Sequence, residues 1–343
     1  MVCRGHWSNG ADPRAAERRY ARGFCQYKKV SDRILRGHYR RLFLAGDLQQ
    51  TFGRLHQHRQ FYTPTYGRLM RITEPAPGNH DSYTSDSRGA YAGYREYFGR
   101  RAHWNRRGGS YSFDLGSWHI ISLDSQWCGD FTWAYPDKHW ENVPLWSKDS
   151  PWGCHKGDLE FDWLVRDMYR HSDSQCTLAY FHHPAYFWIP YAGGPDVLVH
   201  DGYTKSRPLY RYGADVVLNG HQHFHQRFQP MNPKAQIDAE YGLTEFIVAT
   251  GVDTLQQVPP ASKQPEQVAA ADNTTFGFLR LNLYRGGYAW RFVPARGFPG
   301  RWRDSKKYDV KILENGTGGG GTVDSGSASC YGAPPEGYLS SGG

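Results

Sequence analysis

The sequence predicts an α/β domain in which helices cover a mixed β-sheet on both faces. Residues 215–219 read DVVLN, a nearly continuous apolar run that indicates a strand buried on both sides. Runs of this kind alternate along the chain with segments of helical periodicity, which is typical of parallel strands joined by helices. Two hairpins add antiparallel strands, so we expect the sheet to be mixed.

Several segments define the strands. The run RLFLAGD indicates a buried strand that ends at Asp47. Two segments on either side of Leu115-Gly116 predict a hairpin, and a second hairpin is expected across Arg285-Gly286-Gly287. The arms of the first hairpin and the remaining strands are expected at residues 110–114, 118–124, 176–181, 215–219 and 246–251.

Two helices are expected between these strands. Residues 157–171 carry apolar side chains at helical spacing, and a second helix is expected near residues 205–212. The apolar face of the first helix comprises Leu159, Phe161, Trp163, Leu164 and Met168.

Composition divides the chain into three parts. Residues 1–38 are Arg-rich and predict a basic, poorly ordered head with at most short helices near 12–20 and 30–36. Because such a segment buries little apolar surface to offset its ordering entropy, we expect it to pack poorly on the body and to supply no metal ligand. Residues 39–295 are expected to form one folded domain, and residues 296–343 an irregular Gly/Ser-rich tail.

The formal net charge of +8 originates in the head. Residues 1–46 hold 11 Lys/Arg and 3 Asp/Glu, and the rest of the chain holds 30 of each sign, out of totals of 41 and 33. A basic segment of this kind is usually solvated, and contact with nucleic acid is an alternative that rests on the head alone. No apolar run approaches the roughly 18 residues of a membrane span, which excludes an integral membrane protein.

The six cysteines indicate disulfides rather than a thiolate zinc site, because none of them forms a CxxC pair. Their even number and the sequons at Asn273 and Asn315 favour an exported protein. Cys128 and Cys154 flank an inserted loop, and we expect them to pair. The first residues lack the apolar segment of a signal peptide.

Four short motifs at predicted strand ends, or in the loops after them, carry candidate metal ligands. Ligands collect beyond the carboxyl ends of strands in open α/β sheets, so we expect the motifs to converge. Their carboxylate, amide and imidazole donors suit zinc, manganese or iron. The motifs are Gly46-Asp47, Gly78-Asn79-His80-Asp81, His182-His183-Pro184 and Gly220-His221-Gln222-His223.

In this order, the motifs GD, GNHD, HHP and GHxH resemble those of the calcineurin-like metallophosphoesterases. The body is most similar to the secreted bacterial phosphatases related to purple acid phosphatases. The similarity covers about residues 42–294 and includes GSYSFDLGSWHIISLDS, CTLAYFHHPAYF and YGADVVLNGHQHFHQRFQP. It implies a four-layer αββα sandwich of two mixed sheets, with the first strand missing here, and a secreted or cell-envelope location.

The resemblance implies two metal ions, divalent or mixed-valence Fe, Zn or Mn. Asp47 would bridge them. His182 is favoured over His183 as a ligand because the family ligand precedes an x-Pro pair. The residues that would bind metal are Asp47, Asn79, His182, His221 and His223.

The resemblance also implies catalytic roles for His80 and Asp81. His80 would stabilise the transition-state charge or protonate the leaving alcohol, and Asp81 would orient its ring. A metal-activated hydroxide would be the nucleophile, and the substrates would be small phosphorylated molecules, expected to be phosphomonoesters.

Three positions depart from the family pattern. The family's first motif, an Asp that ends a leading apolar strand, has no clear counterpart, because Asp12 has no strand before it and residues 22–25 carry no carboxylate. Gln50 and His225 each stand where the related phosphatases have Tyr; the change at His225 is expected to be tolerated. With Gln50 in place of a Tyr ligand and no first-motif Asp, the first metal keeps only Asp47 and His223, fewer than the usual three protein ligands, so we expect one metal to bind firmly and the other weakly.

Three explanations of this pattern remain open. The chain can be a truncated or frame-shifted phosphatase, a degenerate homologue that binds a metal or phosphate without catalysis, or an active enzyme with another ligand. We predict metal-dependent hydrolysis of phosphoric esters, with the non-catalytic homologue as the alternative. No specific nucleic-acid partner is expected.

Overall fold

The computed structural model describes most of the body of the chain and parts of its tail. The described residues are 27–49, 52–82, 90–125, 159–189, 197–199, 203–251, 254–259, 261–295, 301–304, 311–314, 324–335 and 338.

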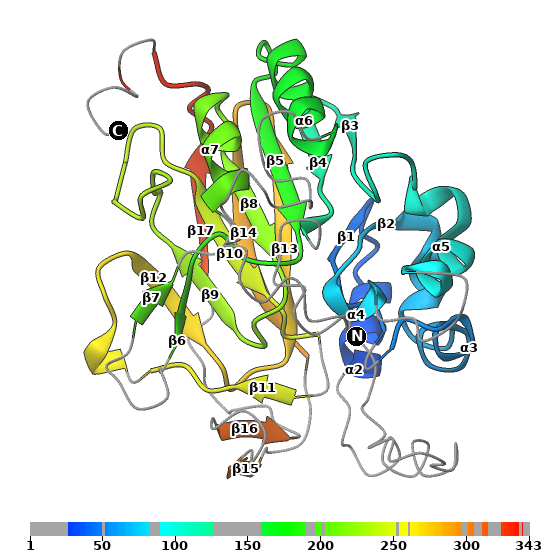
Figure 1. Ribbon diagram of the computed structural model, residues 1–343. Coiled ribbons are helices and arrows are strands. Elements are labelled where there is room, and N and C mark those ends of the chain that lie inside the picture. The colour runs from blue at the N-terminus through cyan, green and yellow to red at the C-terminus, as the bar shows by residue number, and fades with distance from the viewer. Residues whose placement is uncertain are drawn as a thin grey trace, which may run out of the picture.

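A seven-stranded mixed sheet forms the first inner layer, in the order β12-β9-β10-β8-β5-β4-β3 (Figure 1). Strands β4, β5, β8 and β10 are mutually parallel, and β3 and β9 run antiparallel to their neighbours. The strands are β3 (Tyr111–Leu115), β4 (Trp118–Ser122), β5 (Cys176–Phe181), β8 (Val216–Asn219), β9 (His225–Phe228), β10 (Thr244–Val248) and β12 (Val268–Asp272).

A second inner layer faces this sheet and is built from two groups of strands. One group is the parallel pair β1 (Leu42–Ala45) and β2 (Thr73–Ala76). The other is the antiparallel set β13 (Gly277–Tyr284), β14 (Gly287–Pro294) and β17 (Ser325–Ser329). An apolar cluster between the layers joins large-sheet residues with residues of both groups; its members include Trp118, Leu178, Tyr180, Phe246, Phe43, Leu279, Leu281 and Trp290.

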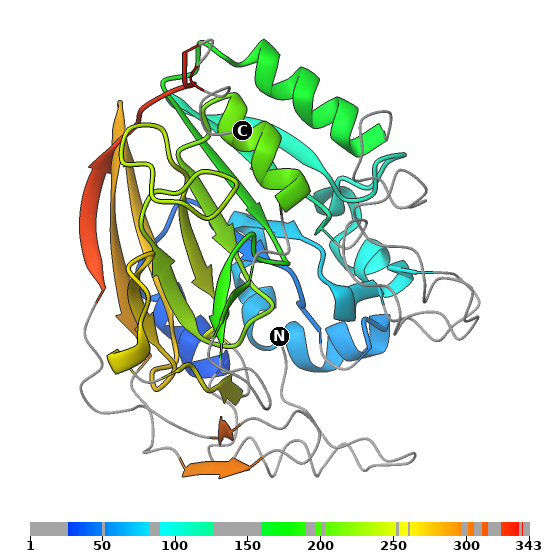
Figure 2. The same cartoon turned by 60° about the vertical axis from the view of Figure 1, so that its left-hand side comes forward.

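Helices cover the outer face of each layer. On the seven-stranded sheet, α6 (Leu159–Arg170) and α7 (Tyr203–Arg211) pack Leu164, Met168 and Leu209 against residues of β4, β5 and β8. On the second layer, α2 (Tyr27–Leu35) and α5 (Ala92–Phe98) pack in an aromatic-rich cluster with β1. Figure 2 shows α6 and α7 on one side of the large sheet and β13, β14 and β17 on the other. The αββα arrangement is therefore confirmed.

Short elements complete the fold. Near α5 lie α3 (Leu55–Gln57), a π-helix (His58–Tyr62), a 3₁₀ helix (Tyr66–Ile72), α4 (Asn79–Ser82) and a 3₁₀ helix (Gly99–Ala102). The peripheral strands and the last 3₁₀ turn are β6 (Phe187–Ile189), β7 (Val197–Val199), β11 (Thr254–Gln256), β15 (Arg301–Asp304), β16 (Lys311–Glu314) and Ala261–Lys263.

Part of the basic head is packed, which differs from the expectation for residues 27–38. Tyr27, Val30 and Ile34 of α2 are each under 5% exposed and lie in the same cluster as Leu42 and Leu44. Their spacing places them on one face of the helix. This short apolar stripe is enough to pack α2 on the body, although the head as a whole is rich in Arg. Asp12 and residues 22–25 lie outside the described residues.

Part of the tail is also ordered, unlike the irregular tail that we expected. Residues 325–329 form β17 on β14, and Cys330 forms a disulfide with Cys176 at the start of β5. SGSAS has no apolar alternation, so backbone pairing and the disulfide place a strand that periodicity does not reveal. Cys128 and Cys154 lie outside the described residues, and their pairing stays a prediction.

The disulfide closes a loop between residues 154 positions apart. Because a closed loop of this size restricts the unfolded chain, we expect Cys330→Ser to lower the free energy of unfolding by about 2–5 kcal/mol. Urea unfolding with and without reductant checks this. Parent and variant should be equally stable when both are in reductant, and equal stability without reductant would contradict the prediction.

His119 on β4 is 1% exposed and bridges two carboxylates, 2.9 Å from Asp114 and 2.8 Å from Asp167, while its ring stacks on His171. Burial alone lowers the pKa of His119, but the bonds to Asp167 and Asp114 outweigh it and raise the pKa above 6.5. A raised His pKa stabilises the fold fully below about pH 6.5, and this stability is lost as pH rises through the folded pKa.

We therefore expect His119→Asn to cost about 1–3 kcal/mol at pH 6 and clearly less at pH 9. Urea midpoints at the two pH values measure the difference, with the exposed His56→Ala as the control. A stability cost that is larger at pH 9 than at pH 6 would show that the predicted direction of the pH dependence is wrong.

Candidate metal centre

The four motifs follow neighbouring strand ends. Gly46-Asp47 follows β1, and Gly78 to Asp81 comes soon after β2. His182-His183 follows β5, and Gly220 to His223 follows β8. Because β1 and β2 are parallel and β5 and β8 are parallel, the carboxyl ends within each pair meet at one edge, as the sequence predicts.

A tight turn after β1 brings Asp47 to the centre. Gly46 and Asp47 both have positive φ, 75° and 53°. A Cβ on Gly46 would lie 2.5 Å from His182 Nδ1, so only glycine allows β1 to approach His182 this closely. The GD motif therefore has a steric reason as well as a chemical one.

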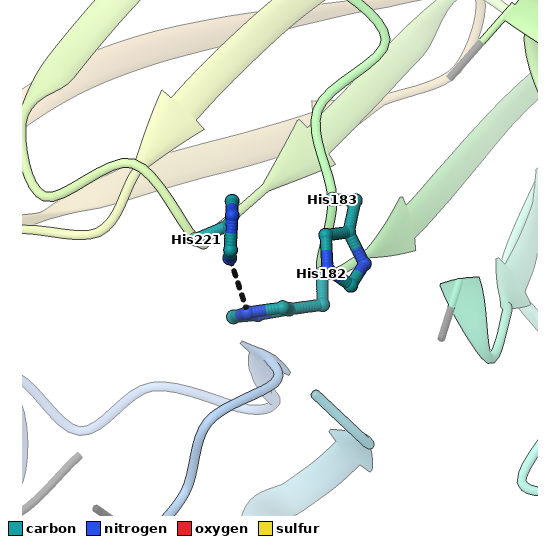
Figure 3. A group of neighbouring side chains, drawn as sticks. All are labelled: His182, His183 and His221. Carbon is teal, nitrogen blue, oxygen red and sulfur yellow. Dashed lines mark hydrogen bonds between the residues drawn. The ribbon is translucent and has the colours of Figure 1, made fainter. Parts of the chain in front are cut away.

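Four predicted ligands are linked by contacts that pass through His182 and Asn79. His182 Nε2 lies 2.9 Å from Asn79 Oδ1 and 3.3 Å from Asp47 Oδ1. His221 Nδ1 lies 3.1 Å from His182 Nε2 and 3.2 Å from Asn79 Oδ1. Asp47, Asn79 and His182 are each at most 9% exposed. Figure 3 shows the edge of His221 directed at His182.

The protonation of these groups suits a cation. His182 Nδ1 lies 2.8 Å from the Ala45 carbonyl and donates to it, so Nε2 faces the acceptors Asn79 Oδ1 and Asp47 Oδ1. Burial lowers the pKa of His182, but Asp47 outweighs it and raises the pKa above its usual value. A proton on Nε2 is thus favoured between these three atoms, and a cation would take its place. The residues present therefore fit a divalent metal, for which Asp47, Asn79, His182 and His221 supply four donors.

Electrostatics maintain the ligand forms of Asp47 and His221. Burial would raise the pKa of Asp47, but His182 and His80 hold it well below its usual value. Burial and the neighbouring His182 lower the pKa of His221 to about 3. Near neutral pH, Asp47 is thus a carboxylate and His221 a neutral imidazole.

His183 lies in the same group of imidazoles, but its hydrogen bonding differs from that of His182. Ser125 Oγ accepts the backbone N–H groups of His182 and His183, so its hydroxyl hydrogen is donated to His183 Nδ1 at 3.0 Å. His183 then carries its proton on Nε2 and cannot coordinate through that atom. This supports His182 as the ligand.

His223 is fixed by its backbone to Gln256 of β11: its N–H donates to Gln256 Oε1 and its carbonyl accepts from Gln256 N. Within the described ranges, no group of three His, Cys, Asp or Glu side chains within 4.8 Å includes His223. It is close enough for its charge to affect the pKa of His221. The convergence that we expected thus holds for four residues and is looser for His223.

His80 and Asp81 take different positions. His80 donates its backbone N–H to Asp47 Oδ1, and its ring Nε2 lies 4.0 Å from Asp47 Oδ2. The Asp81 carboxylate is fully buried and accepts N–H groups from Leu48, Gln49 and Gly78. Asp81 therefore joins the two loops through their backbone, and its role in orienting the His80 ring stays a prediction.

Sequence reasoning missed two supporting residues. Ser125 anchors the His182-His183 pair, as described above. Glu245 on β10 is fully buried and accepts the N–H groups of Ala185 and Tyr186 just after Pro184. The sequence did contain a signal for Glu245. It is a carboxylic acid inside the apolar strand TEFIV, and a buried polar group needs hydrogen-bond partners.

Of the two remaining departures from the family pattern, the structure describes His225 but not Gln50. His225 is buried, with Nε2 2.9 Å from Asp324 and Nδ1 3.2 Å from the Ile247 carbonyl, so it joins β9 to the tail. Gln50 lies outside the described residues.

Comparison with known proteins places the chain in a family. The model of the calcineurin-like phosphoesterases matches residues 18–225. The chain belongs to this family, whose fold and site are those of a metal-dependent phosphoester hydrolase.

Individual relatives are distant. Human acid phosphatase type 7 is 22% identical over 257 residues, 64% of this chain and 50% of that protein. An acid phosphatase of Aspergillus ficuum is 23% identical over 231 residues, 57% of this chain and 36% of that protein. The chain thus spans half or less of the length of these relatives.

Solved structures share the fold. Purple acid phosphatase PPD1 from yellow lupin has a TM-score of 0.52 at 14% identity, covering 89% of this chain and 49% of that one. PhoD has a TM-score of 0.55 at 13% identity, covering 89% and 67%. GAP50, titled the anchor in the inner membrane complex of Plasmodium, has a TM-score of 0.52 at 10% identity, covering 91% and 84%. Among the described residues, no helix has the length and apolar character needed to span a bilayer.

His182 and His183 differ in hydrogen bonding, so we predict that their replacement has different effects on metal binding. We expect His182→Ala to weaken zinc binding at least about tenfold because a ligand is lost, whereas His183→Ala retains it within a few fold. Isothermal titration of the metal-free protein with zinc measures both variants. The reverse order of effects would make His183 the ligand.

Proposed function

We propose that this chain hydrolyses phosphomonoesters with a divalent metal held by Asp47, Asn79, His182 and His221. The observation that carries the proposal is the contact among these four side chains at the strand ends. Family membership supports the reaction class, and the acid phosphatases among the relatives support phosphomonoesters as the substrate class. The two matched acid phosphatases and the disulfide also favour a secreted or cell-envelope location.

The bound metal would act as a Lewis acid on a phosphoryl oxygen and lower the pKa of water. The protein's own contribution is positioning. The Ala45 carbonyl fixes the His182 ring, Asp81 ties the Gly46-Asp47 loop to the Gly78 loop, and Glu245 fixes the chain after Pro184. Each tie limits movement of a ligand during turnover.

His80 is the candidate acid. Its side chain is 19% exposed, whereas that of Asp47 is 2% exposed, and its ring lies 4.0 Å from Asp47 Oδ2. The His80 ring is therefore partly open to solvent beside a proposed ligand, where it can stabilise developing charge or protonate the leaving oxygen.

One observation favours a second candidate function. The four close ligands account for one cation, and His223 lies outside their group. A chain that holds a single cation can bind a phosphate group without rapid hydrolysis, because one cation lowers the pKa of water less than a pair. Turnover at excess metal separates the two: metal-dependent hydrolysis supports the enzyme, and phosphate binding without hydrolysis supports the binding protein.

The experiment is the rate of aryl phosphate hydrolysis against added manganese or zinc. We expect slow hydrolysis that rises with excess metal, and a loss of about a hundredfold or more in His221→Ala, since a ligand to the charge-stabilising cation is removed. The exposed His56→Ala, in the same preparation, is the matched control and should keep the parent rate. Brisk turnover that needs no metal and survives His221→Ala would contradict the proposal.

A further inference from the structure

A second group of potential metal ligands lies at the edge of the seven-stranded sheet. An oxygen of Asp114 and one nitrogen each of His119 and His171 lie within 4.8 Å of one another. Asp114 is on β3, the last strand of the sheet, His119 is near the start of β4, and His171 directly follows α6. We call these three residues the edge cluster.

The edge cluster is separate from the candidate metal centre. His119 lies beside Thr177, near the start of β5, whereas His182 follows the end of that strand. At roughly 3.3 Å per residue, the strand places the two histidines about 15 Å apart. A cation at the edge cluster therefore lies too far away to contact a phosphate at the candidate metal centre.

Both imidazoles of the edge cluster have the outer hydrogen bonds that metal ligands need. A metal-bound histidine donates its second ring N–H to a carboxylate or a backbone carbonyl, which fixes its tautomer and orientation. His119 Nε2 lies 2.8 Å from Asp167 Oδ2, and Ser112 Oγ donates to the same carboxylate at 2.9 Å. His171 Nδ1 donates to the Asp167 backbone carbonyl at 2.8 Å. These bonds leave His119 Nδ1 and His171 Nε2 as the atoms that can coordinate a cation.

Asp114 supplies the third donor. His119 Nδ1 lies 2.9 Å from Asp114 Oδ1. In the metal-free chain a proton lies between these two atoms, and a cation can take its place.

The cluster combines a fixed ligand with two that can adjust. His119 is 1% exposed, whereas the side chains of Asp114 and His171 are 64% and 34% exposed. Donor atoms around a tetrahedral zinc ion lie about 3.3 Å apart, since each bond is about 2.0–2.1 Å long. Small rotations of the two exposed side chains therefore suffice to enclose a cation that enters from solvent.

The charges around the cluster suit a divalent cation. The carboxylates of Asp114 and Asp167 balance two positive charges. His171 also stands at the C-terminal end of α6, where the helix dipole favours a cation. Two imidazoles with one carboxylate favour zinc, copper or nickel over magnesium or calcium, which prefer oxygen ligands alone.

We propose that the edge cluster binds one divalent cation of the zinc class through Asp114, His119 and His171, with water in the remaining position. Three protein ligands and an open position distinguish it from a closed four-ligand site, so the cation exchanges with solvent. The cation joins the edge hairpin of β3 and β4 to the C-terminal end of α6. Because it binds the folded arrangement, it stabilises the fold as its concentration rises.

Zinc titration of full-length variants tests the proposal. The double variant His182→Ala/His221→Ala removes both imidazoles of the candidate metal centre and leaves the edge cluster intact. We expect it to retain one saturable zinc site in isothermal titration. Adding His171→Ala or Asp114→Asn should weaken that site at least about tenfold, because a ligand is lost. The matched Asp173→Asn removes an exposed carboxylate just after His171 and should leave it unchanged.

Electron paramagnetic resonance with copper identifies the donor atoms. Copper bound to the double variant should show coupling to two imidazole nitrogens, and to one after His171→Ala. Asp167→Asn keeps all three ligands but weakens the acceptor of His119 Nε2. It should therefore lower the affinity about 10–100-fold while both nitrogens remain in the spectrum, an effect that a purely structural role of Asp167 would not produce.

The parent background covers the case that the double variant fails to fold. There, His171→Ala and Asp114→Asn should each remove one zinc per chain and the zinc-dependent rise in melting temperature that this ion provides. Asp173→Asn should remove neither.

Three outcomes would overturn the proposal. A folded double variant that binds no zinc means that His119 serves only to bridge its two carboxylates. Zinc binding that survives both His171→Ala and Asp114→Asn places the cation elsewhere. A copper spectrum without imidazole nitrogen excludes His119 and His171 as ligands.

Discussion

The hydrogen bond from His182 Nδ1 to the Ala45 carbonyl is the contact on which the candidate site depends. It joins the end of β5 in the seven-stranded sheet to the end of β1 in the second layer, so it sets the distance between the halves of the ligand set. It also fixes the tautomer of His182 and directs Nε2 at Asn79 and Asp47. Gly46 makes the approach sterically possible, and Asp81 ties the loop of Asp47 to that of Asn79. A metal at this point would take the place of the proton that Asp47 favours on His182 Nε2 and would be attracted to all four donors.

The same junction explains why the second layer matters for the site. Asp47 and Asn79 follow β1 and β2, a pair of four-residue strands that is separated from β13 by a cavity of about 870 Å³. This cavity is also lined by Gly46 and His221, so it extends to the proposed ligands. His182 and His221 follow β5 and β8, whose residues are mostly buried in the large sheet. β1, which carries Asp47, packs instead on the aromatic cluster around α2 and contacts His182.

The sequence predicted the α/β class, most strands of the large sheet and the positions of α6 and α7, because buried runs and helical periodicity are local signals. The four-layer arrangement came from resemblance to a family. A short helix was expected near residues 30–36, but its packing on the body was missed because the Arg-rich composition masked three apolar residues. The strand 325–329 was missed because it consists of small residues. At the site, the placement of the four motifs at strand ends was predictable from the sequence pattern, and the choice of Asp47, Asn79, His182 and His221 within them came from the family resemblance. The roles of Ser125, Glu245 and Asp81 were not predictable, since they depend on which backbone N–H groups those side chains reach after folding.

X-ray absorption at the zinc edge of the zinc-loaded chain tests the central claim most directly, because it reports the donor atoms themselves. The account predicts a shell of nitrogen and oxygen at about 2.0–2.1 Å with the outer-shell scattering of two imidazoles, from His182 and His221. A sulfur shell near about 2.3 Å, or a spectrum without imidazole scattering, would contradict it.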